Sequence, residues 1–182
     1  MSAKIEATIE DLYRVPENGK AEIVDGEIVL MAPTGDLPAR AGVAILISLR
    51  LHEGKTPGRT FPDNAGFRVN LPNRGSFSPD VAWHTGKSTG MKFLDGAPVF
   101  AVEIRSEHDY GARAETSLAR KRADYFAAGT LVVWDVDLLA TDVIKSYGAE
   151  DPDSPRIFRR GDIADAEPAV PGWRMPVDDL LL

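Results

Sequence analysis

Residues 98–104 read PVFAVEI, an apolar run that only Glu103 interrupts. Its short length and its β-branched residues are typical of a strand that is buried in the centre of a sheet. An ionised carboxylate in such a run must be neutralised, paired with a cation or bound to a metal. We therefore expect this strand to lie at the centre of the fold and Glu103 to be a candidate functional residue.

A second carboxylate lies one strand earlier. Residues 78–82 read SPDVA, in which Asp80 stands where a short apolar stretch begins. Neighbouring strands would bring Asp80 and Glu103 together, and paired carboxylates in a chain without cysteine suit a hard ion such as Mg²⁺, which prefers oxygen ligands. The alternative is structural, because aspartate after proline is common in turns and Glu103 could pair with Arg105.

The segment after the central strand is expected to be a helix over residues 111–128. On a helical wheel, Lys121 and Arg122 lie within or beside the apolar arc that should pack against the sheet. One of these cations could reach the carboxylate pair and orient a water molecule or a phosphate. Lysine suits proton transfer better than arginine, because its pKa responds to burial. The alternative is that both stems pass the core and carry their charges to solvent.

The patterns on either side of this centre predict further elements. Asp25-Gly26 between two apolar stretches is the strongest hairpin signal, because the tight turn needs positive φ. The other expected elements are a helix over 37–52 whose apolar residues are Val43, Leu46, Ile47 and Leu51, strands over 67–71 and 77–83 with a turn at 72–76 between them, a buried strand over 131–136 and an edge strand over 143–147.

The composition bounds the class of protein. A chain of 182 residues that is 43% hydrophobic and 27% charged fits one packed domain, 1–182, with a loop-rich extension over 148–182. No apolar run approaches the roughly 20 residues of a membrane-spanning helix, and no secretory signal is apparent, so a cytoplasmic protein without a membrane partner is expected. The absence of cysteine excludes disulfides and thiolate sites, and the net charge of −7 argues against a broad nucleic-acid-binding surface but not against a local basic cleft.

Four stretches occur in a characteristic order: EIVDGEIVLMAPTG (22–35), SPDVAW (78–83), FAVEIRS (100–106) and KRADYFAAGTLVVWDVD (121–137). Together they resemble the Uma2 family, also called DUF820, of the PD-(D/E)xK nuclease superfamily. The resemblance covers residues 11–147. It implies an α/β fold with a restriction-endonuclease-like core, in which a mixed β-sheet is flanked by helices and preceded by an N-terminal β-hairpin.

The resemblance also implies a metal site. Asp80, Glu103 and the backbone carbonyl of Ile104 would hold Mg²⁺ or Mn²⁺, and Glu22 of the hairpin would be a further ligand. The alternative for Glu22 is an ordinary glutamate on a surface strand.

A lysine from the helix after the central strand is thought to complete such sites, and Lys121 occupies that place. Arg105 stands where the superfamily motif has its own lysine, so the assignment between Arg105 and Lys121 stays open. We also expect Arg105 and Arg122 to contact the substrate.

The expected function is metal-dependent hydrolysis of phosphodiester bonds, with DNA as the substrate and RNA left open. A homodimer is a further expectation, since dimers are common among relatives that cut both strands. One alternative is a nuclease-like module that binds nucleic acid or protein without catalysis. Another is a metal-free α/β scaffold, in which removal of the buried Glu103 charge would stabilise the fold.

Overall fold

The strand around Glu103 lies in the middle of the larger sheet of the computed structural model, which describes residues 6–15 and 19–181. β8 (Phe100–Ile104) pairs in parallel with β9 (Val132–Val136) and antiparallel with β6 (Val81–His84), so the sheet is mixed, as expected. From one edge to the other, its strands are β11 (Asp151–Phe158), β10 (Ile144–Gly148), β9, β8, β6 and β3 (Arg59–Phe61).

The two faces of this sheet are covered by different helices. The even-numbered residues of β8 pack against α2 (Asp36–His52) and the C-terminal segment. On the other face, Ala101 packs with Tyr125 of α3 (Ala112–Ala127). Because side chains alternate along a strand, Glu103 points to the same side as Ala101. The carboxylate therefore faces α3, the helix that carries Lys121 and Arg122.

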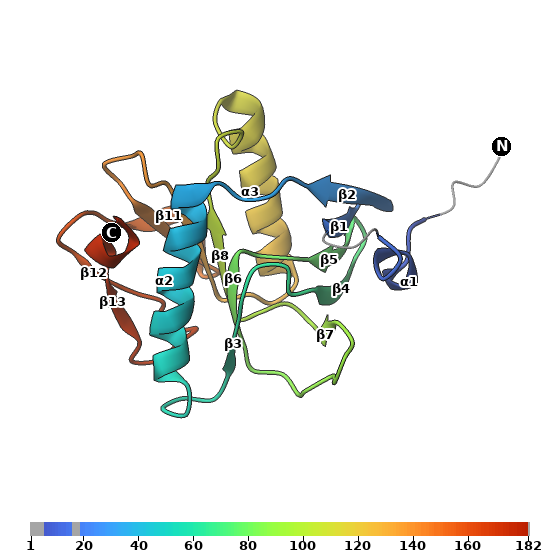
Figure 1. Ribbon diagram of the computed structural model, residues 1–182, viewed down its shortest axis with the longest axis horizontal. Helices are drawn as coiled ribbons and strands as arrows, with labels where there is room; N and C mark the ends of the chain where they lie inside the picture. Colours follow the sequence, from blue (N-terminus) through green and yellow to red (C-terminus); the bar gives the residue numbers. More distant parts are fainter. Residues whose placement is uncertain (1–5, 16–18, 182) are drawn as a thin grey trace.

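A smaller sheet lies on the α3 side. In spatial order its strands are β2 (Glu27–Met31), β1 (Lys20–Val24), β5 (Arg74–Phe77), β4 (Phe67–Leu71) and β7 (Leu94–Asp95), and the short helix α1 (Ile9–Leu12) precedes them in the chain. The predicted hairpin turn is confirmed, with φ of 51° at Asp25 and 72° at Gly26. Figure 1 shows this sheet on the right and the C-terminal strands on the left, with the larger sheet and its helices between them.

The helix predicted over 37–52 is confirmed as α2, but most of the apolar residues that indicated it are exposed. The residues buried against the sheet are Ala41, Ile45 and Leu49. Leu46 is partly buried, and the exposed members are Val43, Ile47 and Leu51. The face with Ala41, Ile45 and Leu49 packs on the sheet, where the small residues Ala41 and Gly42 let the helix approach closely. A Cβ added at Gly42 would lie 3.5 Å from Ile104 Cδ1. In the ranges that the structure describes, no helix, α2 included, is long and apolar enough to cross a membrane.

The strand predicted over 77–83 is two strands in different sheets. β5 ends at Phe77, β6 begins at Val81, and the turn predicted at 72–76 is shorter, since β5 already begins at Arg74. Pro79 explains the break, because proline has no N–H to donate to a ladder. The break places Asp80 at the entrance of β6, outside either strand.

The segment after residue 147 is more ordered than its prolines suggest. It contains β11, β12 (Ile163–Asp165), β13 (Arg174–Pro176) and the 3₁₀ helix η1 (Val177–Leu181), and β10 is internal rather than an edge strand. Proline is tolerated in β11 because an edge strand needs no donor on its outer side. Trp173 from this segment is buried against Phe100 and Trp134, so the core includes residues beyond 147.

Trp173→Ala is expected to lower the free energy of unfolding by about 3–5 kcal/mol, because it leaves a cavity in the main core. Leu51→Ala is the matched control: the Leu51 side chain is 74% exposed, so its loss is expected to change stability by less than about 0.5 kcal/mol. Urea denaturation followed by circular dichroism measures both. Equal losses of stability in the two variants would contradict the assignment of the buried face of α2 and of the C-terminal segment to the core.

Candidate functional site

Asp80, at the entrance of β6, and Glu103, on the neighbouring strand β8, open into one cleft. The Asp80 amide donates to the Val102 carbonyl at 3.1 Å, and the Ile104 amide donates to Asp80 Oδ2 at 2.7 Å. These two bonds hold the Asp80 side chain against the end of β8. The cleft has a volume of about 670 Å³ and runs between β1 and β2 on one side and the first half of α3 on the other. The two carboxylates predicted to form the site are thus brought together.

Each of these carboxylates forms an ion pair with a different lysine. Lys121 Nζ lies 2.8 Å from Glu103 Oε2, and Lys20 Nζ lies 2.9 Å from Asp80 Oδ1. Both lysine side chains are largely buried, at 14% and 13% exposure respectively. The helical wheel predicts Lys121. Sequence reasoning missed Lys20. A signal for it is present in the sequence: Lys20 and Glu22 are two residues apart on one strand, so their side chains share a face of the sheet.

The environment of Glu103 combines burial with two donors. The Tyr125 hydroxyl donates to Glu103 Oε1 at 2.6 Å, while Lys121 binds the other oxygen. Burial raises the pKa of Glu103 above its ordinary value, Lys121 opposes this, and the Asp80 and Glu22 charges add to it. Burial also raises the pKa of the Tyr125 hydroxyl, with the two glutamates acting in the same direction.

The lysines keep their charges despite burial. Burial opposes the charge on Lys121, but the Glu103 and Glu22 carboxylates outweigh it and hold the pKa of Lys121 above its ordinary value. Burial acts in the same way on Lys20, and the Asp80 and Glu103 carboxylates outweigh it, so the pKa of Lys20 is also raised. Both ammonium groups are therefore protonated at neutral pH.

Glu22 lies behind Lys121 rather than in the cleft. Its side chain is 2% exposed; Oε1 accepts from the Ser78 amide at 2.8 Å, and Oε2 accepts from Arg74 at 2.7 Å. Lys121 Nζ lies 3.0 Å from Glu22 Oε1. Arg74 in turn donates to Asp124 of α3 at 2.8 Å. The expectation that Glu22 is a metal ligand stays a prediction, but its contacts make it a residue that holds Lys121.

The two arginines expected near the site lie differently. Arg105 makes a bidentate ion pair with Asp135, with both N···O distances at 2.7 Å, and also donates to Glu115. The guanidinium of Arg122 stacks on the ring of Tyr147 at 3.7 Å. Arg105 lines the cleft, whereas Arg122 does not line it. Lys121, not Arg105, is the cation that contacts Glu103, and this favours Lys121 for the lysine role.

The oxygen donors in the cleft fit a hard divalent ion. In the ranges 6–15 and 19–181, no group of three or more acidic, histidine or cysteine side chains is arranged to hold a metal. Mg²⁺ needs fewer, since it is usually bound through one or two carboxylates and keeps several waters. Asp80, Glu103 and Ile104 all line the cleft, and the two carboxylates already accept ammonium cations. Their donor chemistry therefore suits Mg²⁺ or Mn²⁺.

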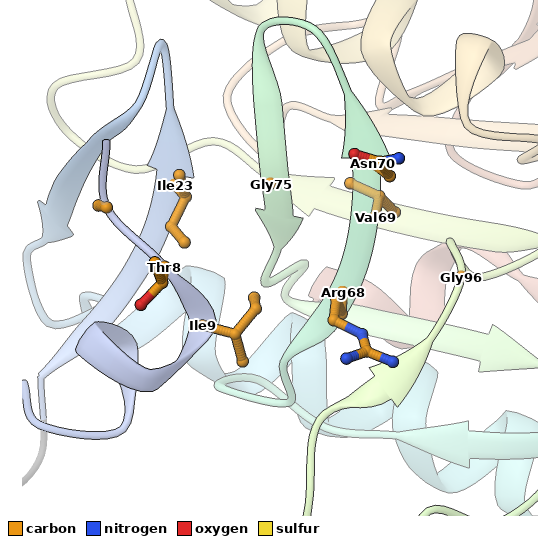
Figure 2. Close-up of a pocket in the computed structure, with 9 residues that line it drawn as sticks. Thr8, Ile9, Ile23, Arg68, Val69, Asn70, Gly75 and Gly96 are labelled. Atoms are coloured by element: carbon orange, nitrogen blue, oxygen red, sulfur yellow. The ribbon is translucent and has the colours of Figure 1, made fainter. Parts of the chain in front are cut away.

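A second hollow on the smaller sheet has different chemistry. Figure 2 shows it between the N-terminal segment at Thr8 and Ile9 on one side and β4 and β5 on the other. Its volume is about 570 Å³, and its lining residues in the described part of the chain include no carboxylate. Arg68, which lines it, is already paired with Asp95. The cleft at Asp80 and Glu103 is therefore the candidate site.

An aspartate at the entrance of one strand, a glutamate on the neighbouring strand of a mixed sheet and a lysine from the following helix form the arrangement expected of a protein of the restriction-endonuclease-like class. The chain belongs to the Uma2 family: the family model, described as "Putative restriction endonuclease", matches residues 8–178. The match extends past residue 147, where the sequence resemblance ends, and so includes most of the C-terminal segment.

A solved structure has the same fold. The chain is similar to a crystal structure of "a putative nuclease belonging to DUF820" from Anabaena variabilis ATCC 29413, with a TM-score of 0.73 and 15% sequence identity. The similarity covers 96% of this chain and 97% of that one, so it includes the C-terminal strands. No curated protein matches the chain.

Glu22→Ala is expected to lower the free energy of unfolding by about 3–5 kcal/mol, because it leaves the buried Arg74 and Lys121 charges without a shared partner. Arg159→Ala is the control, since its ion pair with Asp142 is largely exposed and is expected to contribute less than about 1 kcal/mol. Chemical denaturation at neutral pH measures both. A Glu22→Ala variant as stable as the wild type would show that Glu22 does not hold the two cations.

Proposed function

We propose that this protein is a metal-dependent nuclease that hydrolyses phosphodiester bonds in DNA with Mg²⁺ or Mn²⁺. The observation that supports it most is the convergence of Asp80 and Glu103 on one cleft with a buried lysine from α3. Membership of a family described as "Putative restriction endonuclease" supports the same class of reaction. A homodimer, in which two copies each cut one strand, belongs to the same proposal.

Asp80, Glu103 and the Ile104 carbonyl would hold the ion. When bound, such an ion activates water and neutralises charge that develops on the phosphate. The protein's contribution is to fix the donors: the Ile104 amide orients Asp80, and the Tyr125 hydroxyl orients Glu103. Neither carboxylate then needs to reorganise as the reaction proceeds.

Lys121 would stabilise charge rather than remove a proton. The Glu103 and Glu22 carboxylates outweigh burial and hold the pKa of Lys121 above its ordinary value, so the ammonium enters the reaction as a hydrogen-bond donor. Glu22 and Glu103 hold the ammonium from two directions, and the side chain lines the cleft. From this position Lys121 can donate to a non-bridging phosphate oxygen or orient the attacking water.

Four cationic side chains line the cleft despite the acidic net charge of the chain, and once an ion had neutralised Asp80 and Glu103, a DNA backbone would meet these cations. Lys20, Arg105 and Arg113 line the same cleft as Lys121. Since phosphate contacts give most of the non-specific affinity for DNA, binding confined to this cleft is expected to weaken steeply with salt.

A second candidate function is binding without catalysis. It is favoured by one observation: Lys20 and Lys121 already neutralise both carboxylates, so the fold does not need an ion for its stability. In that case, DNA or protein binding would survive both EDTA and Glu103→Gln, and no cleavage would occur with either metal.

The direct test is cleavage of supercoiled and linear DNA, and of RNA, by the purified protein with Mg²⁺, with Mn²⁺ and with EDTA. Asp80→Asn, Glu103→Gln and Lys121→Met are each expected to reduce the cleavage rate by about a hundredfold or more, because each removes a group that acts on the developing charge. Asp142→Asn, which alters only an exposed ion pair with Arg159, is expected to cleave at the wild-type rate. Full activity in a folded Asp80→Asn variant would contradict the proposal.

A further inference from the structure

Lys20 is a second lysine of the cleft with two acidic partners. Its ammonium lies 2.9 Å from Asp80 Oδ1 and 2.7 Å from Asp63 Oδ1. Asp80 belongs to the site, whereas Asp63 lies on the loop between β3 and β4. The Lys20 ammonium therefore bridges two carboxylates. One is Asp80, which the proposed metal site needs as a ligand, and the other is Asp63, which the proposed site does not use.

The charges of the cleft show why this bridge matters. In the structure, Asp80 and Glu103 are balanced by Lys20 and Lys121. Both Asp80 oxygens already accept a hydrogen bond, Oδ1 from Lys20 and Oδ2 from the Ile104 amide. An ion that binds Oδ1 would lie beside the Lys20 ammonium, and like charges at that separation repel strongly. One ammonium must therefore move off its site carboxylate when the ion binds.

Lys20 is better placed to move than Lys121. The second partner of Lys121 is Glu22, which is fully buried and fixed by Arg74 and the Ser78 amide. The second partner of Lys20 is Asp63, whose side chain is 48% exposed and lies in a loop. A hollow of about 210 Å³ between α2 and this loop is lined by Asp63 and Asp80, the two acidic partners of Lys20.

We propose that Lys20 holds the place of the metal at Asp80 in the metal-free protein and passes to Asp63 alone when the ion binds. This inference rests on the proposed metal site and adds to it a residue that sets its affinity. Lys20 keeps Asp80 in place and neutralised before the ion arrives, and Asp63 keeps the Lys20 ammonium paired afterwards. Lys20 is thus a positioning residue that competes with the metal.

Calorimetric titration with Mn²⁺ at fixed ionic strength tests the competition. Lys20→Met is expected to bind Mn²⁺ about tenfold more tightly than the wild type, or better, because the competing charge is gone while the apolar stem stays. Lys20→Arg, which keeps the charge, is expected to bind no more tightly than the wild type. Lys87→Met makes the same change of net charge on an exposed loop and is expected to leave the affinity unchanged.

A double-mutant cycle tests the role of Asp63. Asp63→Asn is expected to weaken Mn²⁺ binding in the wild type, because Lys20 then has only Asp80 to hold. In the Lys20→Met background, Asp63→Asn is expected to alter the affinity for Mn²⁺ by less than about twofold, since the ammonium that would pair with Asp63 is absent. An equal loss in both backgrounds would overturn the exchange, because Asp63 would then act on the ion through its own charge.

The outcomes separate the two levels of the proposal. If the wild type binds Mn²⁺ and folded Lys20→Met binds it equally or more weakly, Lys20 does not compete with the ion. The proposed metal site is then still supported. No Mn²⁺ binding by either protein overturns the metal site and the inference together. If Lys20→Met does not fold, Lys20→Gln, which also removes the charge but keeps a polar group beside Asp80 and Asp63, takes its place in the titration and in the double-mutant cycle, with the same expected and contradicting results.

Discussion

A buried carboxylate needs a partner, and the structure around Glu103 is arranged to supply one. Glu103 lies in a strand whose other residues are buried, and its two oxygens receive the Tyr125 hydroxyl and the Lys121 ammonium, both from α3. An unpaired charge there would cost several kcal/mol, which is comparable to the net stability of a domain. The position of α3 across the sheet is therefore tied to the chemistry of one side chain.

The charges around Glu103 must also be paired, and they form a series of ion pairs of alternating sign. Lys121 is shared with Glu22, Glu22 is held by Arg74, and Arg74 returns to Asp124 on α3. This chain of ion pairs joins the N-terminal hairpin, β5 and α3, which are distant in sequence. These ion pairs hold the Lys121 ammonium on the side away from the cleft. The Glu103 side of the cleft is therefore fixed by buried partners. On the Asp80 side, the exposed Asp63 leaves Lys20 with an alternative partner.

Much of this arrangement follows from local sequence patterns. The lone glutamate in PVFAVEI, the Asp25-Gly26 turn and the helical spacing of Lys121 each depend on neighbours a few residues away, and the structure confirms the strand, the turn and the contact. Side-chain alternation on β8 is enough to place Glu103 towards α3.

The errors concern choices that only long-range packing decides. α2 has two apolar stripes, and the one with Ala41 packs on the sheet, where the helix comes closest. The prolines of the C-terminal segment suggest loops, but Pro152 and Pro155 lie on an edge strand that needs no outer donor. Lys20 was missed because its partners, Asp80 and Asp63, are some 40 to 60 residues away in sequence and only the fold brings them together.

The central claim is that Asp80 and Glu103 together hold a divalent ion. A crystal structure of the wild-type protein with Mn²⁺, collected at a wavelength where manganese scatters anomalously, tests it most directly. We expect an anomalous peak in the cleft at about 2.0–2.3 Å from oxygens of both side chains, with the Lys20 ammonium no longer on Asp80. A well-ordered cleft without that peak at saturating Mn²⁺, with both lysines still on their carboxylates, would contradict the claim and favour a binding module without catalysis.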